Sequence, residues 1–443
     1  MSDNSFAGGN QSSIGIPAGA SLGARVSPMV SDEGSARRFD ALALPEFRLL
    51  WWGGVFVFLA MQTQQVARSW LAYELTGTNT ALGGVLIGFG VAGLVAIPTG
   101  GVLADRFDKR SILMACQTIN TVTAVTIGVA IETGVIAYWM IVAASVVGGS
   151  TISILAPARI AMTADLVSVD RLTNAIMLGS MSSQATRIVG PAIAGTMIGI
   201  AVLGTEGVYY LSAVLSAVAV LLTIRLPSSR PARRVDRSPW DDLRAGVGYT
   251  RDRPELVRPL VLSVLVVMFG FAHQAFLPTV VDEFFGQGAQ GLGLMTTASA
   301  VGAVVMSIGL ANTQREDLDR RQLGAAYSFG GCLVAFALAP SFGLALAAMF
   351  FVGCAMAAFQ TLNSSLVLST ADVAFHGRVQ SLIMLSYSAF GLAALPAGVL
   401  ADRLGLRETM VGMGLAVVAA AVHGHLWRLR ATRGASTVSA DAF

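Results

Sequence analysis

Two arginines lie far inside apolar stretches of the sequence. Arg187 is near the middle of one stretch, and Arg68 is in the last third of another. No Asp or Glu occurs at similar depth in any apolar stretch. A charge at the centre of a bilayer costs at least ~2.5–3.5 kcal/mol, so it normally faces a cavity or a partner. The two cations therefore indicate a water-filled cavity of positive potential or, alternatively, hydrogen bonds to backbone carbonyls that hold helices together.

Neutral hydrogen-bonding side chains occur at comparable depth and could complete such a cavity. Amide and imidazole groups bond polar groups of a ligand without adding charge. The predicted cavity residues are Gln64, Gln65, Arg68, Gln184, Arg187, His273, Gln274, Gln360 and Asn363. This set would suit an amphipathic substrate with negative or hydrogen-bond-accepting groups, such as a catecholate.

Several titratable groups near the ends of the apolar stretches could carry protons. A carboxylate in apolar surroundings or a histidine can change its charge near neutral pH. The proton-coupling candidates are Glu74, Asp165, Asp282 and Glu283, with His273 as a further titratable group.

Other chemistries lack the residues they need. Lys109, the only lysine among the 29 Lys and Arg, follows Asp108, so the Gly-Lys-Ser/Thr of a phosphate-binding loop is missing. Cys116, Cys332 and Cys354 fall inside apolar stretches, and no metal-ligand spacing or Ser/Cys–His pair occurs. We expect no enzyme activity, no cofactor, no metal and no nucleic-acid partner.

Composition places the chain in a lipid bilayer. Hydrophobic residues make up 54% of the 443 positions and charged residues 12%, with a mean hydropathy of +0.67, whereas soluble domains carry about 25% charge. A helix crosses the bilayer core with roughly 20 apolar residues, and barrel strands would alternate instead. We predict an all-α membrane protein with twelve transmembrane helices. The runs are Leu49–Tyr73, Thr80–Leu103, Ser111–Ile131, Ile136–Met162, Leu172–Val202, Gly207–Leu226, Pro259–Val281, Leu292–Ala311, Leu323–Ala339, Phe342–Leu368, Val379–Ala401 and Met410–Trp427.

The basic residues predict the orientation. With the N-terminus in the cytoplasm, 25 of the 29 Lys and Arg fall on the cytoplasmic side, where such residues collect. Both termini of this multi-pass protein would then be cytoplasmic, in the cytoplasmic (inner) membrane. The first residues are rich in Gly and Ser and resemble no removable signal peptide.

The runs divide into two sets of six. Ser238-Pro239 has the residues of a helix start, after which Trp240, Leu243 and Val247 share one face, so we predict an amphipathic helix between the sets. The predicted regions are a disordered cytoplasmic tail (1–40), a six-helix bundle (41–226), a cytoplasmic linker with the amphipathic helix (227–258), a second six-helix bundle (259–428) and a cytoplasmic tail (429–443).

The two sets carry related sequences. Thr163-Ala-Asp165 recurs 207 residues later as Thr370-Ala-Asp372, and Glu74-Leu-Thr-Gly77 matches Glu283-Phe-Phe-Gly286 at nearly the same offset. Two matches in consistent order indicate duplication. Two pseudo-symmetric bundles related by an axis along the membrane normal form a transporter plan in which substrate binds between them.

The segment Gly101-Val-Leu-Ala-Asp105-Arg106-Phe-Asp108-Lys109-Arg110 resembles the signature loop of the major facilitator superfamily, although Asp108 stands where Gly is usual. This resemblance implies a cytoplasmic gate that contains Gly101, Asp105, Arg106 and Arg110. A further copy, Gly398-Val-Leu-Ala-Asp402, falls on the opposite side of the membrane in this topology, and we interpret it as loop structure.

Other segments are similar to the efflux branch of this superfamily, which includes the enterobactin exporter and related drug exporters. They are Gln65–Gly77, Pro157–Arg159 leading to Asp165, and Arg187-Ile-Val-Gly190-Pro191-Ala-Ile-Ala-Gly195. The last resembles the Gly-Pro motif of drug/proton antiporters, which usually ends in two glycines, whereas Ala194 precedes Gly195 here. Pro191 frees a backbone carbonyl and kinks the helix, and Gly190 and Gly195 allow close approach of neighbouring helices. Plain packing is the alternative.

These features predict a monomeric secondary transporter that exports drug- or siderophore-like amphipathic molecules by alternating access, with protons as the coupling ion. Two alternatives are an uptake permease for a small anionic solute and a membrane sensor or scaffold with the same fold but no transport.

Overall fold

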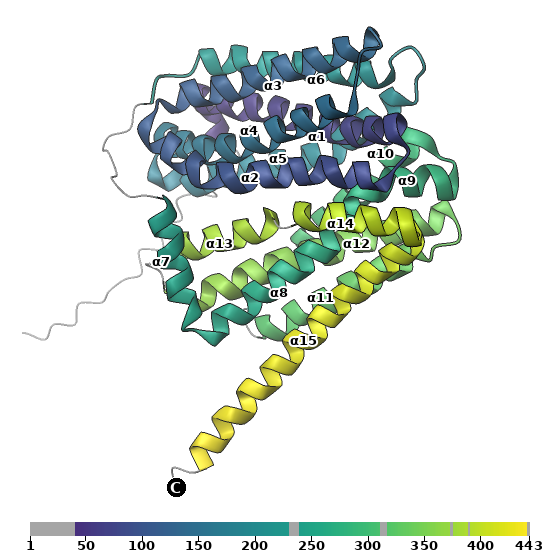
Figure 1. Cartoon of the computed structure of the whole chain (residues 1–443). Coiled ribbons are helices and arrows are strands. Elements are labelled where there is room, and N and C mark those ends of the chain that lie inside the picture. Colours follow the sequence, from purple (N-terminus) through teal and green to yellow (C-terminus); the bar gives the residue numbers. More distant parts are fainter. Residues whose placement is uncertain (1–39, 230–238, 311–316, 373–374, 389, 441–443) are drawn as a thin grey trace, which may run out of the picture. The chain divides into compact units, whose positions relative to one another are not determined.

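The structure, a computed structural model, describes residues 40–229, 239–310, 317–372, 375–388 and 390–440. Every regular element in these ranges is a helix (Figure 1). The helices are η1 (Asp40–Ala43), α1 (Pro45–Thr76), α2 (Asn79–Arg106), α3 (Lys109–Glu132), α4 (Tyr138–Leu166), α5 (Val169–Ile198), α6 (Gly204–Ile224), α7 (Pro239–Arg251), α8 (Pro254–Gly270), η2 (Phe271–Phe276), α9 (Leu277–Thr279), η3 (Val280–Phe284), α10 (Gly288–Leu310), α11 (Leu318–Ala337), α12 (Phe342–Thr370), α13 (His376–Ser388), α14 (Phe390–Leu404) and α15 (Leu406–Ala440).

Eight spans in the described residues are long and apolar enough to cross a membrane. They are α3, α4, α6, α10, α12, the helical stretch 254–284, the span that contains α13 and α14, and Leu406–Leu429 of α15. The sequence predicts twelve spans, and the other four runs correspond to the long helices α1, α2, α5 and α11. α1 and α5 contain arginine and glutamine side chains, which lower their mean hydropathy.

The duplicated segments have matching backbone geometry. Gly77 and Gly286 follow the first long helical stretch of each half, and their φ angles are +60° and +61°. Glycine adopts this left-handed conformation without the steric cost that a Cβ atom adds. α4 and α12 both end at the repeated Thr-Ala-Asp segment. Equivalent helices therefore end in equivalent ways in the two halves.

The helices pack as two groups in chain order. In the first, α1 contacts α5 and α6, α2 contacts α4, and α3 contacts α6. In the second, α12 contacts α10 and α11, and α15 contacts α8 and α11. Figure 1 shows the first half in purple and blue on one side and most of the second half in green and yellow on the other. α7, which begins at the predicted Pro239, contacts α13 and α2.

The two halves meet along α2 with α14 and along α5 with α10. At the first contact, a Cβ atom on Gly83 would lie 2.4 Å from the carbonyl oxygen of Ala394. At the second, a Cβ atom on Gly195 would lie 2.7 Å from Cα of Gly293. Glycine therefore allows both helix pairs to approach to backbone contact, as small residues do in membrane proteins.

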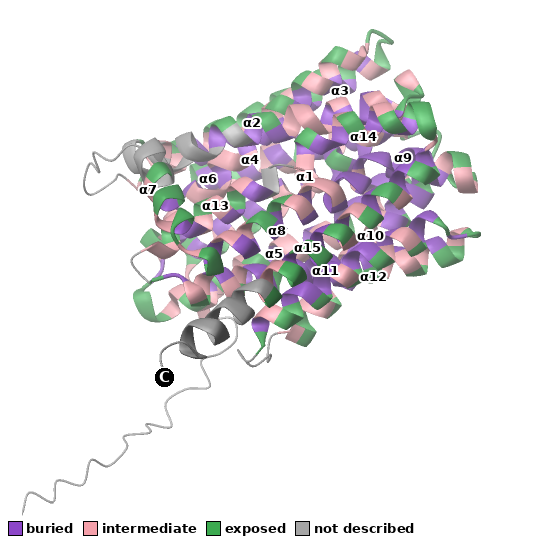
Figure 2. Ribbon diagram, turned by 60° about the horizontal axis from the view of Figure 1, so that its bottom comes forward, coloured by how far each residue is buried: buried purple, intermediate pink, exposed green. Residues whose placement is uncertain are grey.

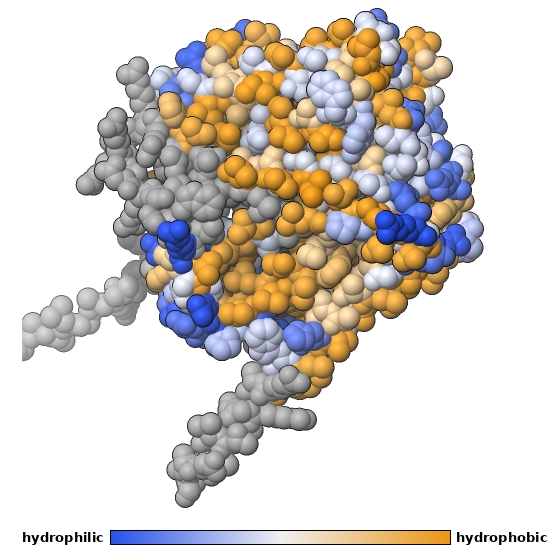
Figure 3. Space-filling model, in the orientation of Figure 1, coloured by the Kyte–Doolittle hydropathy of each residue, from blue (hydrophilic) through white to orange (hydrophobic). Residues whose placement is uncertain are grey.

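Large apolar side chains remain on the outside of the bundle. Val95, Val122 and Ile308 are exposed by 59–71%, and exposed residues recur along the whole length of the helices (Figure 2). Hydrophobic residues cover the middle of the face in Figure 3, and hydrophilic residues gather toward its edges. Lipid chains can cover such a surface, whereas water cannot solvate it favourably.

The helices begin and end at two opposite ends of the molecule, the linker end and the far end. The linker end contains Lys109, Asp165 and Ser229, where α2, α3, α4 and α6 begin or end. The far end contains Gly77, Asn79 and Asp402. These two ends would lie on opposite sides of a membrane whose lipid chains cover the apolar outer surface.

Candidate substrate cavity and its closing contacts

Two adjoining cavities lie between the halves, about 300 and 330 Å³ in volume. Phe58, Gln62, Gln65, Ser69, Ile152, Arg187 and Gln274 line both of them. The linings include residues of α1, α4 and α5 from the first half and of η2, α10 and α12 from the second. This position between the halves is where a two-bundle transporter binds its substrate.

Arg68 contributes a buried cation to the larger cavity. Its side chain is 8% exposed, and it makes no hydrogen bond or ion pair to a described residue. A Cβ atom on Gly148 of α4 would lie 3.2 Å from a guanidinium nitrogen of Arg68, so glycine leaves room for this side chain. An unpaired guanidinium in a low-dielectric setting attracts an anion strongly.

Arg187 is the second cation of the cavity and lines both parts. It projects from α5, four residues before Pro191, and is half-buried. Like Arg68, it has no ion pair among the described residues. None of the described residues that line either cavity is Asp or Glu. The cavity therefore carries positive charge without an internal counter-charge.

Neutral polar groups complete the lining. Of the predicted residues, Gln64, Gln65, Gln274 and Gln360 lie in it together with the two arginines. Among the described residues, the amide nitrogen of Gln64 is buried without a partner, and the Gln274 amide makes one weak bond, to the sulfur of Met356 at 4.0 Å. Amides without firm partners are available to a ligand. The lining also includes Gln62, Asn120 and Ser145, which the sequence analysis did not select.

Three predicted cavity residues lie elsewhere. His273 is 1% exposed, bonds the carbonyl of Gly270 through Nδ1 and packs against Phe329. Asn363 is fully buried, and its Oδ1 accepts a hydrogen bond of 2.6 Å from Nε2 of Gln322. Gln184 is on α5 but not among the lining residues. The depth of these residues is suitable, but the rotation of their helices turns them away from the cavity.

A third arginine, Arg159, is also buried, although the charge count places it on the cytoplasmic side of the membrane. It lies within α4 and is 9% exposed. Its guanidinium lies 5.1 Å from the ring centroid of Phe58, a cavity residue, and one nitrogen is 3.5 Å from the carbonyl oxygen of Trp51. A Cβ atom on Gly54 would overlap the guanidinium, so the glycine leaves room for Arg159 in this position. Two buried arginines of the first half, Arg68 and Arg159, and the half-buried Arg187 thus have no carboxylate partner among the described residues.

The proton-coupling candidates occupy both ends. At the far end, the hydroxyl of Tyr73 donates to Asp282 at 2.9 Å, and Nε1 of Trp70 donates to Glu74 at 2.7 Å. Glu74 and Glu283 are exposed. Asp165 lies at the linker end, where Lys109 forms an ion pair with it and Ser229 donates to it. None of these carboxylates lines the cavity.

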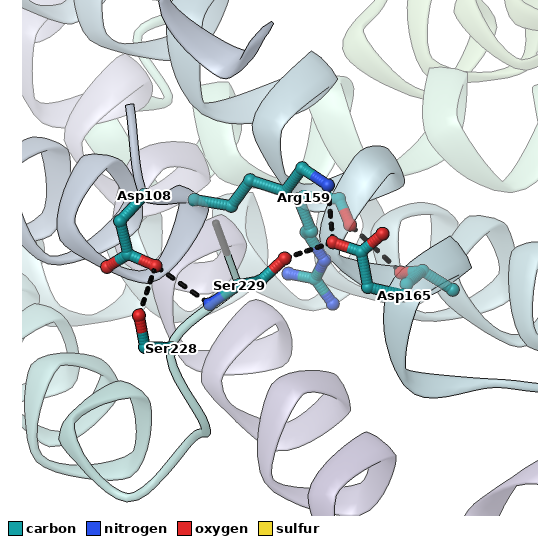
Figure 4. Close-up of polar contacts among 7 residues, drawn as sticks. Asp108, Arg159, Asp165, Ser228 and Ser229 are labelled. Atoms are coloured by element: carbon teal, nitrogen blue, oxygen red, sulfur yellow. Dashed lines mark hydrogen bonds and ion pairs between the residues drawn. The ribbon is translucent and has the colours of Figure 1, made fainter. Parts of the chain in front are cut away.

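A polar cluster at the linker end joins the chain after α6 to the ends of α3 and α4 (Figure 4). Asp108 caps α3 by accepting from the backbone and hydroxyl of Ser111, at 3.0 and 2.7 Å. It also accepts from Ser228 and from the backbone of Ser229. Burial raises the pKa of Asp108, but these hydrogen bonds outweigh burial and hold its pKa below the usual value.

Of the predicted gate residues, Gly101, Asp105 and Arg106 belong to the last turns of α2, and their side chains lie outside the described residues. Arg110 is half-buried in the first turn of α3, and its Nε has no hydrogen-bond partner. The predicted surface residues Trp240 and Leu243 also have side chains outside the described residues.

The residues of the predicted kink pack tightly against other helices. Pro191 lies inside a continuous α5 and lines one cavity. A Cβ atom on Gly190 would lie 2.5 Å from Cβ of Gln62 on α1, and Gly195 faces Gly293 on α10. Both glycines therefore permit close helix contacts beside the cavity, in the way that small residues do.

Comparison with known proteins defines the class. A family model described as "Transmembrane secretion effector" matches residues 36–443. The chain is a multi-pass membrane transporter of the major facilitator superfamily and not an enzyme, as the resemblance in its loop and helix motifs implies. Within that superfamily it belongs to the transmembrane secretion effector family.

Known relatives are distant but match over most of their length. The chain is 22% identical to the staphyloferrin A transporter of Staphylococcus aureus, over 82% of this chain and 91% of that protein. It is 21% identical to macrolide efflux protein A of Streptococcus pyogenes, over 85% and 94%. A solved bacterial homologue of the human lysosomal transporter Spinster, inward-facing and unoccupied, matches with a TM-score of 0.70 at 14% identity, over 89% and 98%. That structural likeness establishes the fold.

Proposed function

We propose that this transporter exports small amphipathic anions through the cavity that contains Arg68 and Arg187. The main support for this substrate class is that two guanidinium groups line the cavity, while none of the described lining residues is acidic. Burying a cation without a counter-charge is unfavourable, and a bound anion offsets that cost. The remaining lining includes Phe58, Phe89 and Phe390, which suit an apolar or aromatic body.

The similarity to exporters supports the direction of transport. The family model is described as a secretion effector, and one relative is a macrolide efflux protein. Another relative is named as a transporter of staphyloferrin A, a siderophore, which fits a drug- or siderophore-like substrate class. The partial Gly-Pro motif around Pro191 also favours export in exchange for protons.

The proposed topology has twelve transmembrane helices, six in each half, with both termini in the cytoplasm and the protein acting as a monomer. The distribution of 25 of 29 basic residues supports this orientation in the cytoplasmic membrane. The linker end is then cytoplasmic and the far end is external. Gly101, Asp105, Arg106 and Arg110 would form part of the cytoplasmic gate.

Proton coupling requires a group that changes charge as the cavity opens to each side. Asp282 is the best placed candidate because Tyr73 of the other half bonds to it, so opening of the far end must change its surroundings. Glu283, the next residue in the chain, is a further candidate. Glu74, which matches Glu283 in the sequence repeat, is another. Asp165 is held by Lys109 and Ser229, which favours a structural role.

Transport by inside-out membrane vesicles tests the proposal. An inside-acid gradient should drive accumulation of a catecholate siderophore or of staphyloferrin A, but not of ethidium, a lipophilic cation. Accumulation that occurs only in right-side-out vesicles would identify an uptake permease. If no compound moves although the protein is folded, the chain is a sensor or scaffold and the proposal is wrong.

A further inference from the structure

Asp402 at the far end of the molecule joins the two halves. The sequence predicts loop structure at Gly398-Val-Leu-Ala-Asp402, but α14 continues to Leu404 and contains the whole segment. Residues four positions apart lie on the same face of a helix. Gly398 and Asp402 therefore face the same neighbour, which is the start of α2.

The carboxylate of Asp402 bonds the first turn of α2 through four donors. Oδ1 accepts from the backbone nitrogen and side-chain amide of Asn79, at 2.8 and 3.0 Å. Oδ2 accepts from the backbone nitrogen and hydroxyl of Thr80, at 2.8 and 2.6 Å. The hydroxyl of Thr78 accepts from the backbone of Ala81 at 3.3 Å. Three of the N–H groups that a helix start leaves unpaired are thus satisfied, two of them by the other half.

Gly398 permits this arrangement. A Cβ atom there would lie 2.4 Å from the carbonyl oxygen of Asn79. The glycine brings α14 close enough for Asp402 to reach the helix start, where a negative charge is stabilised by the helix dipole. Gly83 and Gly391 continue the close contact of α2 with α14 toward the cavity.

This contact lies on one side of the cavity. Phe390 of α14 lines the larger cavity, and Asp402 is twelve residues further along, roughly 18 Å at 1.5 Å per residue. The Tyr73–Asp282 bond also joins the two halves at this end. A cavity that opens at the far end must separate both pairs, because the members of each pair belong to different halves.

We propose that Asp402, Asn79 and Thr80 form a latch that holds the far end closed. The latch rests on the alternating access included in the proposed function. Asp402 is exposed at the surface, so breaking the latch loses its four charge-assisted bonds to Asn79 and Thr80 without burying or exposing the carboxylate. These bonds favour the state in which the cavity is shut at this end. Asp402 is therefore a residue that sets the balance between the two states of the transport cycle.

Distances between spin labels test the latch without substrate and without knowledge of sidedness. In a chain with Cys116, Cys332 and Cys354 replaced by alanine, Val135→Cys and Leu338→Cys place labels on exposed positions of different halves at the far end. Pulsed electron resonance on the purified protein then reports closed and open populations. In Asp402→Asn, one oxygen becomes an amide group that cannot accept from Thr80 or Asn79, and the ratio of long to short distances should rise about tenfold.

Arg403→Gln is the matched control, since Arg403 is the exposed neighbour at the same depth. It should leave the distances unchanged. Thr80→Val removes only the hydroxyl donor, should raise the ratio about threefold, and keeps the test valid if Asp402→Asn does not fold. An unchanged distribution in the folded Asp402→Asn protein, or an equal rise in Arg403→Gln, would overturn the latch. The distance measurement does not require transport. A failed vesicle assay would therefore contradict the proposed function without deciding whether the latch exists.

Discussion

Arginines that lie at least half-buried in the two halves of the molecule have different surroundings. In the second half, Arg258 is 8% exposed and forms an ion pair with Asp319, which also contacts Arg428 at 3.0 Å. In the first half, Arg68, Arg159 and Arg187 have no ion pair among the described residues. A paired buried charge mainly satisfies its partner, whereas an unpaired one is available to a ligand.

The repeat makes the contrast sharper. By the register that aligns Gly77 with Gly286, Gln65 aligns with Gln274, and both line the cavity, but Arg68 aligns with Leu277. By the register that aligns Asp165 with Asp372, Arg187 aligns with Ala394. The halves share helix ends and neutral polar groups but not cations. The arginines of the cavity therefore lie on the wall formed by the first half, while the described lining residues of the second half are uncharged.

Removal of a cation from the charged wall should have the largest effect. Arg187→Gln should lower kcat/KM for an exported anion roughly 30- to 150-fold, because a lost charge-assisted bond is worth about 2–3 kcal/mol. Its thermal stability should stay unchanged or rise, since a half-buried cation without an ion pair among the described residues is removed. Vesicle flux and thermal melting measure the two quantities. Arg320→Gln, an exposed position, is the control; intact flux with a lower melting temperature would assign Arg187 to structure.

A carboxylate on the uncharged wall of the cavity, which the second half forms, should offset the positive charge of the first half. Gln274→Glu adds a negative charge opposite the arginines in a site that both cavities share. The new carboxylate competes with the substrate, so anion flux should fall about 10- to 30-fold, and ethidium flux should become measurable. Gln287→Glu places the same group on an exposed position at the far end and should change neither flux. Equal losses in both variants would mean that charge in the cavity is not the cause.

A methyl group between the halves should have a moderate effect. Gly195→Ala puts a Cβ atom against Gly293, and backbone cannot move aside as a flexible side chain can. The closed far end should become less favourable, and transport should drop about tenfold as the cycle loses that state. Gly179→Ala in the same helix meets nothing within 4 Å and should be active. Full activity of Gly195→Ala would show that α5 and α10 can move apart enough to fit a methyl group without loss of transport.

The smallest effect concerns the linker end. The lowered pKa of Asp108 means that its hydrogen bonds stabilise the folded state above the ordinary carboxylate range and are lost as pH falls through the lowered value. Thermal melting should therefore show a small drop below about pH 4 that is absent from Asp108→Asn. The exposed Asp372 has fewer bonds, from Tyr249 and Arg253, and Asp372→Asn should keep the drop. The same acid dependence in Asp108→Asn would contradict this assignment.

The sequence was sufficient for helix positions and for residue depth. Each predicted run overlaps a long helix or a helical span, although α15 continues thirteen residues beyond the last run, from Trp427 to Ala440. Arg68, Arg187 and four of the predicted glutamines lie in the cavity lining. Depth is readable because charge and amide groups are costly in lipid wherever they occur.

Rotation of each helix about its axis was not readable from the sequence. Lipid and the protein interior are both apolar, so a membrane helix has no strong polar face to show which side packs inward. His273, Gln184 and Asn363 were placed in the cavity by depth alone and lie elsewhere. Arg159 was missed because its position gave no sign of burial. It lies six residues before Asp165, near a helix end, where arginine is common. Packing against other helices buries it.

The glycine contact between α5 and α10 has a mechanical consequence. Gly195 is three residues from one end of α5 and 26 from the other, roughly 5 and 39 Å at 1.5 Å per residue. If this contact is the pivot, a tilt of about 10° displaces the linker end of α5 by ~7 Å and its far end by less than ~1 Å. Small rotations would then open a wide passage on one side only, and opening the other side requires a second pivot closer to the linker end.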